Sequence, residues 1–140
     1  MNKYINVGIN FIVTTLLLTA CSSSFVIVDR TGMTFQVQDI KLKDGKSIEI
    51  LDGEAVRYIP IKSISKLVLD PSQTFFKDGK LYYHANILLT DGTQIKPRIS
   101  SNDTTKSFVH IQNTILGKDE NGDISIPLQD VNIFRKADLE

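Results

Sequence analysis

From residue 25 onward the chain alternates between apolar and polar residues with a period of two, as strands with one buried face do. Short apolar runs follow one another and are separated by Gly, Pro, Asp and Ser. These runs cover residues 25–28, 35–37, 40–42, 47–51, 55–59, 65–69, 81–89, 94–99, 108–116, 124–126 and 131–134. No segment of this part keeps a helical period over several turns. The pattern therefore predicts an all-β fold, a small antiparallel barrel or sandwich.

Asp-Gly and Asn-Gly dipeptides separate many of these runs. Both central residues of a type I′ hairpin turn need positive φ, which Gly adopts freely and Asp or Asn tolerates better than most residues. We therefore expect hairpin turns at these dipeptides. They occupy positions 44–45, 52–53, 78–79, 91–92 and 121–122.

The first run, Phe25-Val26-Ile27-Val28, is apolar on both faces. Such a strand lies at the centre of a sheet or at an edge that pairs with a partner. Because exposed apolar edges aggregate, we expect the central position.

An internal repeat indicates how the strands are organised. Residues 40–48 resemble residues 87–95, at an offset of 47, and residues 59–64 resemble residues 126–131, at an offset of 67. The difference assigns about 20 extra residues to the second copy, in the stretch 97–116. Chance similarity between two short β-meanders is the alternative explanation.

Each copy contains an Ile-Pro pair, at Pro60 and Pro127. Proline donates no backbone hydrogen bond, so we expect both prolines at an edge, a bulge or a bend. The order strand, Asp-Gly turn, strand, Ile-Pro bend, strand resembles SH3-like and Sm-like barrels, although these turn and core residues carry no function across. Two arrangements fit: a single barrel-like domain over residues 25–135, which we expect, or two half-barrels packed on each other.

Charge and size narrow the function classes. The 140-residue chain has 16 basic and 16 acidic residues and a formal net charge of zero. It lacks the basic excess typical of nucleic-acid-binding proteins, so we expect no nucleic-acid partner. The residues after position 24 suffice for one domain with a sizeable core.

The N-terminus has the anatomy of a secretory signal: Lys3, an apolar run from about Ile9, and then Leu18-Thr19-Ala20-Cys21. This tetrapeptide resembles the lipobox of bacterial lipoproteins. The resemblance implies that residues 1–20 are removed by cleavage between Ala20 and Cys21 and that Cys21, the only cysteine, carries a diacylglycerol. The alternative is a short transmembrane helix, but spanning needs about 20 mostly apolar residues and this run is shorter.

The expected order along the chain is signal peptide 1–20, lipidated cysteine and tether 21–24, one β domain 25–135 and a tail 136–140. The tether contains only Ser22, Ser23 and Ser24, and such a segment spans at most roughly 10 Å. We therefore expect an extracytoplasmic protein held close to a bacterial membrane by its lipid. Ser22 resembles an outer-membrane sorting signal, which implies the periplasmic side of the outer membrane if the host has two membranes.

Catalytic and metal-binding patterns are sparse. The only histidines are His84 and His110, whereas a zinc site generally needs three or four ligands with short spacing. The acidic segment 118–123 lacks the ligand spacing of an EF-hand loop and is better explained as a hairpin turn. No serine lies in a G-x-S-x-G frame. We therefore expect no enzyme activity, no metal and no cofactor.

Two functional hypotheses follow from these features. The first is a non-catalytic β domain that binds another envelope protein, as a scaffold or accessory subunit of an assembly. The second is a lipid-anchored binder of a small molecule or glycan, with Tyr58, Tyr82, Tyr83 and His84 as candidate ligand contacts. The absence of tryptophan disfavours a sugar site.

Overall fold

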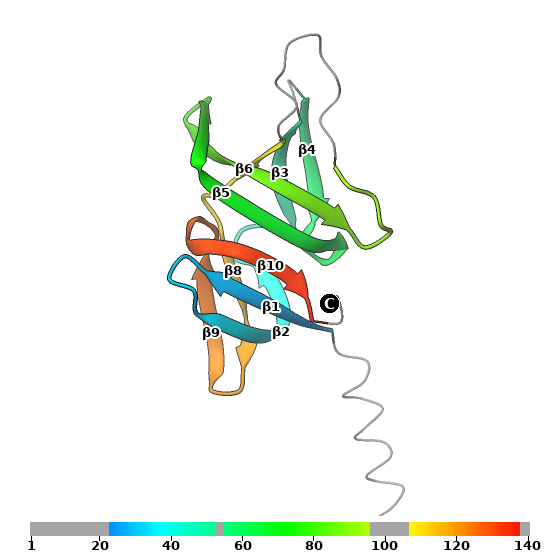
Figure 1. The fold of residues 1–140 in the computed structure, drawn as a ribbon, viewed down its shortest axis with the longest axis vertical. Coiled ribbons are helices and arrows are strands. Elements are labelled where there is room, and N and C mark those ends of the chain that lie inside the picture. Colours follow the sequence, from blue (N-terminus) through cyan, green and yellow to red (C-terminus); the bar gives the residue numbers. More distant parts are fainter. Residues whose placement is uncertain (1–22, 53–54, 96–106, 138–140) are drawn as a thin grey trace, which may run out of the picture.

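The computed structural model describes residues 23–52, 55–95 and 107–137 (Figure 1). The described part consists of ten antiparallel strands in one sheet and two short 3₁₀ helices, which confirms the predicted all-β fold. It contains no helix with the length and apolar character that a bilayer crossing requires. The elements are β1 (Ser24–Asp29), β2 (Thr34–Leu42), β3 (Ser47–Asp52), β4 (Ala55–Pro60), η1 (Ile61–Ser63), β5 (Ile64–Lys77), β6 (Lys80–Leu89), β7 (Ser107–His110), β8 (Thr114–Asp119), β9 (Gly122–Pro127), η2 (Leu128–Asp130) and β10 (Val131–Lys136).

The sheet folds into two five-stranded lobes, one above the other in Figure 1. Its strand order is β4-β3-β7-β6-β5-β10-β1-β2-β8-β9. Lobe A contains β3 to β7, and lobe B contains β1, β2, β8, β9 and β10. The lobes meet where β5 pairs with β10. Both lobes belong to one continuous ten-stranded sheet.

The two lobes share the same strand pairing at a constant offset. The β3–β4 ladder runs from Ser47–Pro60 to Asp52–Ala55, and the β8–β9 ladder repeats every pair 67 residues later. The backbone bond that follows each ladder recurs at the same offset, from Ile61 N to Lys46 O and from Leu128 N to Asn113 O. The repeat predicted around the two Ile-Pro bends is therefore confirmed in the fold.

The other predicted half of the repeat, at an offset of 47, is wrong. The bridge between Leu88 and Gln94 matches the Val28–Thr34 pair of the β1–β2 hairpin, 60 residues earlier. The Asp91-Gly92 turn therefore corresponds to the turn after β1 and not to Asp44-Gly45. The Asp-Gly dipeptide misled the alignment because it marks a turn of either hairpin.

The equivalent strands show that each lobe is assembled from both halves of the chain. Lobe B contains β1 and β2 from the first half of the repeat and β8 to β10 from the second. Lobe A contains β3 to β5 from the first half and β6 and β7 from the second. Leu67 of β5 and Phe134 of β10 are equivalent at the offset of 67 and pair directly with each other. The two lobes are thus related by an approximate twofold axis through this pair.

A single apolar cluster extends through both lobes. Equivalent positions are buried in each lobe, so the repeated register produces a repeated core. In lobe B, the rings of Phe25 and Phe134 stack with their centroids 5.0 Å apart. The buried equivalent pairs are Ile48/Ile115, Ile59/Ile126, Ile61/Leu128, Ile64/Val131, Leu67/Phe134 and Ile27/Ile87.

Other local expectations were met in part. Pro60 and Pro127 end the two edge strands and each precedes a 3₁₀ turn, as predicted. The first run forms β1, which lies between β10 and β2 and is central as expected. Of the turn dipeptides in the described part, only Asp78-Gly79 has positive φ at both residues.

The predicted run 108–116 is not one strand. β7 ends at His110 and β8 starts at Thr114, because residues 111–113 carry the chain from lobe A to lobe B. In the predicted run 94–99, Gln94 forms only an isolated bridge and residues 96–99 lie outside the described residues.

Candidate functional site

Aromatic and histidine side chains gather on the side of lobe A that faces away from its core. Directly opposed residues of an antiparallel pair lie on the same face of a sheet. Phe75 opposes Tyr82, Tyr82 opposes His110, and His84 opposes Phe108, so side chains from β5, β6 and β7 share this face. We call it the aromatic face; it consists of Tyr58, Phe75, Tyr82, His84, Phe108 and His110.

The rings of this face contact one another across the strands. The centroid of the Phe108 ring lies 5.6 Å from that of Phe75 and 6.0 Å from that of His84. The Tyr82 and His110 rings lie 5.6 Å apart. These separations are within the range in which aromatic pairs attract each other. The rings therefore form two groups on this face, Phe75–Phe108–His84 and Tyr82–His110.

A carboxylate anchors one end of this layer. Glu49 of β3 accepts hydrogen bonds from the Tyr82 hydroxyl at 2.6 Å, the Lys80 ammonium at 2.9 Å and the Tyr58 hydroxyl at 3.2 Å. Burial raises the pKa of Glu49, but the bonds from Tyr82 and Lys80 outweigh burial and hold that pKa below its ordinary value. Burial, followed by the bond to Glu49, raises the pKa of Tyr82. Glu49 is therefore ionised and its two oxygens are both engaged.

Three large outward side chains of lobe A are exposed, whereas Tyr82 is only 3% exposed. Tyr58 is 66% exposed, Val56 45% and Phe75 43%. Of the five large hydrophobic side chains that are most exposed in the described part, only Met33 belongs to lobe B. Exposed apolar residues that form a contiguous patch mark interaction sites more often than scattered ones do.

The equivalent surface of lobe B is polar. At the offset of 67, Tyr58 corresponds to Ser125 and Val56 to Asp123. The Phe108–Leu51 pair corresponds to the Gln38–Lys118 pair, so glutamine replaces phenylalanine. Because both lobes have the same strand order and pairing, the fold does not require aromatic residues at these positions. The aromatic face is a property that only lobe A has.

The four sequence-predicted contact residues do not all lie together. Tyr58, Tyr82 and His84 belong to the aromatic face, whereas Tyr83 points to the opposite side of β6. There the guanidinium of Arg30 lies over the Tyr83 ring, 5.7 Å from its centroid. The same guanidinium donates to the Leu69 carbonyl of lobe A at 3.3 Å and to the Gln129 carbonyl of lobe B at 3.3 Å. Tyr83 therefore contributes to the contact between the lobes.

His84 also lies beside a carboxylate. It directly opposes Asp70, which marks the start of an irregular stretch of β5. The Ser72 hydroxyl donates to Asp70 at 2.6 Å and is the main reason why the pKa of Asp70 lies below its ordinary value. No group of three or more His, Cys, Asp and Glu residues within the described ranges is placed to hold a metal ion.

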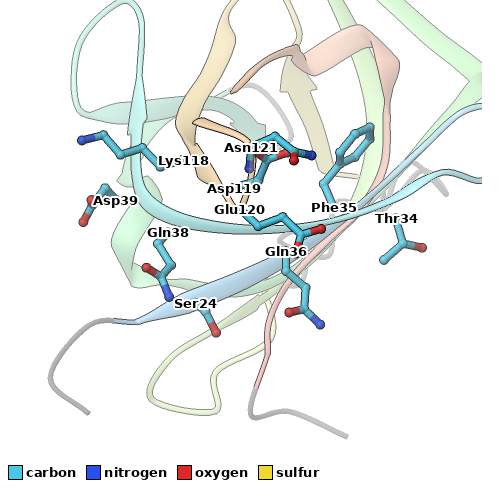
Figure 2. A pocket seen from close by; sticks show the side chains of 10 residues that line it. All are labelled: Ser24, Thr34, Phe35, Gln36, Gln38, Asp39, Lys118, Asp119, Glu120 and Asn121. Carbon is cyan, nitrogen blue, oxygen red and sulfur yellow. The ribbon is translucent and has the colours of Figure 1, made fainter. Parts of the chain in front are cut away.

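A second surface feature is a hollow of about 910 Å³ on lobe B (Figure 2). It lies between β2 and the β8–β9 hairpin and is lined mainly by polar side chains, including Gln36, Gln38 and Asn121. The backbone N–H of Asn121 donates to the Asp119 carboxylate at 2.8 Å, which closes the hairpin turn. The acidic segment 118–123 therefore forms the hairpin that was predicted.

Replacing Tyr82 with phenylalanine is expected to lower the free energy of unfolding by about 1.5 kcal/mol, since a buried bond to a charged carboxylate is lost. Because folding lowers the pKa of Glu49, the ionised carboxylate stabilises the fold above pH 4.5, its ordinary pKa, and this contribution is lost as the pH falls below that value. The penalty of the variant should shrink over the same range. Urea denaturation of both proteins at a series of pH values measures the difference in their free energies of unfolding.

Tyr58→Phe is the matched control, because this hydroxyl makes a longer bond to the same carboxylate at an exposed position. We expect it to change the free energy of unfolding by less than about 0.5 kcal/mol. Equal effects of the two variants would show that the Tyr82 bond has no special role.

Comparison of the chain with protein-family models, with curated proteins and with solved structures found no match.

Proposed function

We propose that this chain is a lipid-anchored, non-catalytic adaptor that binds another protein of the bacterial envelope through the aromatic face of lobe A. The observation that carries the proposal is the contrast between the lobes. One fold is used twice, and the outward positions are aromatic in one copy and polar in the other. The partner interaction makes the chain a scaffold or accessory subunit of a larger assembly.

The dimensions and chemistry of the face suit a protein partner. It extends across five adjacent strands, from Tyr58 of β4 to Phe75 of β5, and strands lie about 4.8 Å apart. The face is therefore roughly 19 Å wide across the strands. An ordinary protein interface buries about 800 Å² on each partner. Aromatic residues are enriched in such interfaces and often supply most of the binding energy.

The proposed anchor belongs to the other lobe. The lipobox-like sequence ends at Cys21, and Ser24 already begins β1 of lobe B. The lipid would therefore hold lobe B at the membrane, on its extracytoplasmic side, while lobe A binds the partner. If the host has two membranes, the residue after the cysteine favours the outer membrane.

Binding of a small molecule or glycan is the second candidate. Tyr58 supplies a ring beside the Glu49 carboxylate, and His84 supplies one opposite Asp70. Both oxygens of Glu49 already accept bonds from this chain, however, and Lys80 already donates to one of them. The polar groups that would orient a sugar are thus engaged within the protein. This observation ranks a ligand below a protein partner.

Photo-crosslinking in the native cell tests the proposal. A photoreactive residue at Tyr58 or Phe108 is expected to capture one abundant envelope protein. The matched controls are Ser125 and Gln38, which occupy the equivalent positions on lobe B and should capture it about tenfold less. Mass spectrometry identifies the captured protein and the yield at each position.

Equal capture from both lobes, or no capture from Tyr58 and Phe108 in a correctly folded protein, would contradict the proposal. The Cys21→Ala variant tests the anchor separately. It should accumulate as an uncleaved or soluble precursor, and normal maturation and membrane retention of this variant would refute lipidation at Cys21.

A further inference from the structure

Among the described strands, the edge of the sheet next to the aromatic face has backbone groups without a strand partner. Within the described ranges β4 pairs only with β3. The bond from Ile61 N to Lys46 O fixes which residues of this hairpin are hydrogen-bonded, since bonded and non-bonded pairs alternate along an antiparallel ladder. Arg57 is consequently bonded to β3, whereas the N–H and C=O groups of Val56 and Tyr58 point to the open edge.

The side chains of this edge that lie on the side of the aromatic face carry no charge. Natural edge strands carry charges or other features that prevent pairing with further strands. β9, the equivalent edge of lobe B, has Asp123 and Ser125 at the positions where β4 has Val56 and Tyr58. Val56 and Tyr58 are 45% and 66% exposed. On the aromatic-face side, β9 therefore carries a charge at this edge, whereas β4 presents two apolar side chains.

The charge on β4 indicates what would pair with it. Arg57 points to the other side of the strand, and its side chain is 50% exposed. Within the described ranges one of its nitrogens contacts the buried carboxylate of Asp52 at 3.4 Å. A guanidinium has five N–H donors, so Arg57 can bind a second carboxylate.

We infer that β4 accepts an extended segment of the partner protein as an added antiparallel strand. The segment has apolar residues opposite Val56 and Tyr58 and an acidic residue between them, opposite Arg57. Its backbone pairs with the free groups of β4, and its apolar side chains continue the aromatic face. This inference rests on the proposed function and specifies how the partner binds.

A second copy of the chain fits this edge less well. In the antiparallel register that places each Val56 opposite the other copy's Tyr58, the two Arg57 side chains also lie opposite each other. Directly opposed like charges destabilise a strand pair. The same position favours a partner with an acidic residue there.

A defined peptide tests the strand addition with purified full-length chain in detergent. The probe is a peptide of alternating valine and glutamate, and the control is a peptide of alternating valine and lysine. The first should slow amide hydrogen exchange of Val56 and Tyr58 at least about tenfold, and the second should not. Protection of Asp123 and Ser125 instead, equal effects of the two peptides, or no protection at Val56 and Tyr58 would overturn the inference.

Two proline variants test the same edge with the native partner. Val56→Pro removes an N–H that points to the open edge, and Asp123→Pro makes the equivalent change in β9. Capture from Phe108 should fall about tenfold with Val56→Pro and stay unchanged with Asp123→Pro. Capture that both variants retain would refute strand addition while leaving the adaptor function in place, whereas no capture from the unmodified chain would refute the adaptor function itself.

A protein that sediments as a dimer and becomes monomeric on Val56→Pro would show that the edge binds a second copy, and would overturn the inference.

Discussion

Alanine at Phe134 is expected to lower the free energy of unfolding by about 3–5 kcal/mol, the usual cost of deleting a buried phenylalanine ring. Phe134 is fully buried, and its ring stacks on that of Phe25 at 5.0 Å. It also opposes Leu67 in the only strand pair that joins the two lobes within the described ranges. The variant therefore loses packing inside lobe B and at the junction at the same time. Urea denaturation followed by circular dichroism measures the loss.

Ile133→Ala is the matched control, because this neighbouring residue pairs with the same strand but is only half-buried. Its cost should be about 1 kcal/mol. If the two variants had similar costs, the junction would not depend on the buried ring.

Isoleucine at Gly117 is expected to lower the free energy of unfolding by about 3 kcal/mol. A Cβ added at Gly117 would overlap the Val37 side chain and lie 2.9 Å from the Gln38 carbonyl oxygen. In lobe A, the equivalent of Gly117 is the fully buried Ile50. The counterpart of Val37 in lobe A is Ser107. Lobe B thus combines the small Gly117 with the larger Val37, and lobe A combines the large Ile50 with the small Ser107.

This exchange predicts a compensating variant. Adding Val37→Ser to Gly117→Ile should recover part of the loss, so that the double variant is about 2 kcal/mol more stable than the sum of the two single changes predicts. The recovery is partial because the Gln38 carbonyl stays in place. A double variant whose loss equals that sum would show that Val37 is not the obstacle and that the two lobes are packed independently of this exchange.

The fold could be predicted from the sequence as far as its local signals reach. The alternation and the turn residues predict most strands. Each Ile-Pro pair marks the end of one of the two repeated hairpins. The strand neighbours could not be predicted in the same way. β3 pairs with β7 and β2 with β8, which are more than 50 residues apart in the chain, and the intervening Asp91-Gly92 turn resembles two different turns equally well.

The candidate site shows the same limit. The sequence predicts Tyr58, Tyr82, Tyr83 and His84 as candidate contacts because their side chains can stack or form hydrogen bonds. Glu49, which binds two of these residues, was not identified because it lies 33 positions from Tyr82 and only the β3–β7–β6 pairing brings them together. The offset of 67 relates Tyr58 to Ser125 and Val56 to Asp123, but the match of Phe108 with Gln38 requires the equivalence of β7 and β2, which the offset of 47 obscured.

The path of the chain through the lobes sets an order for folding. All strands of lobe A are contiguous in the sequence, from Ser47 to His110, whereas β1 and β2 of lobe B must wait for β8 to β10. Pairing between segments distant in sequence is intrinsically slow, and chains are synthesised from the N-terminus. Lobe A can therefore gain its structure first and hold the aromatic face ready. Lobe B needs β8 to β10 beside β1 and β2, so it closes after lobe A.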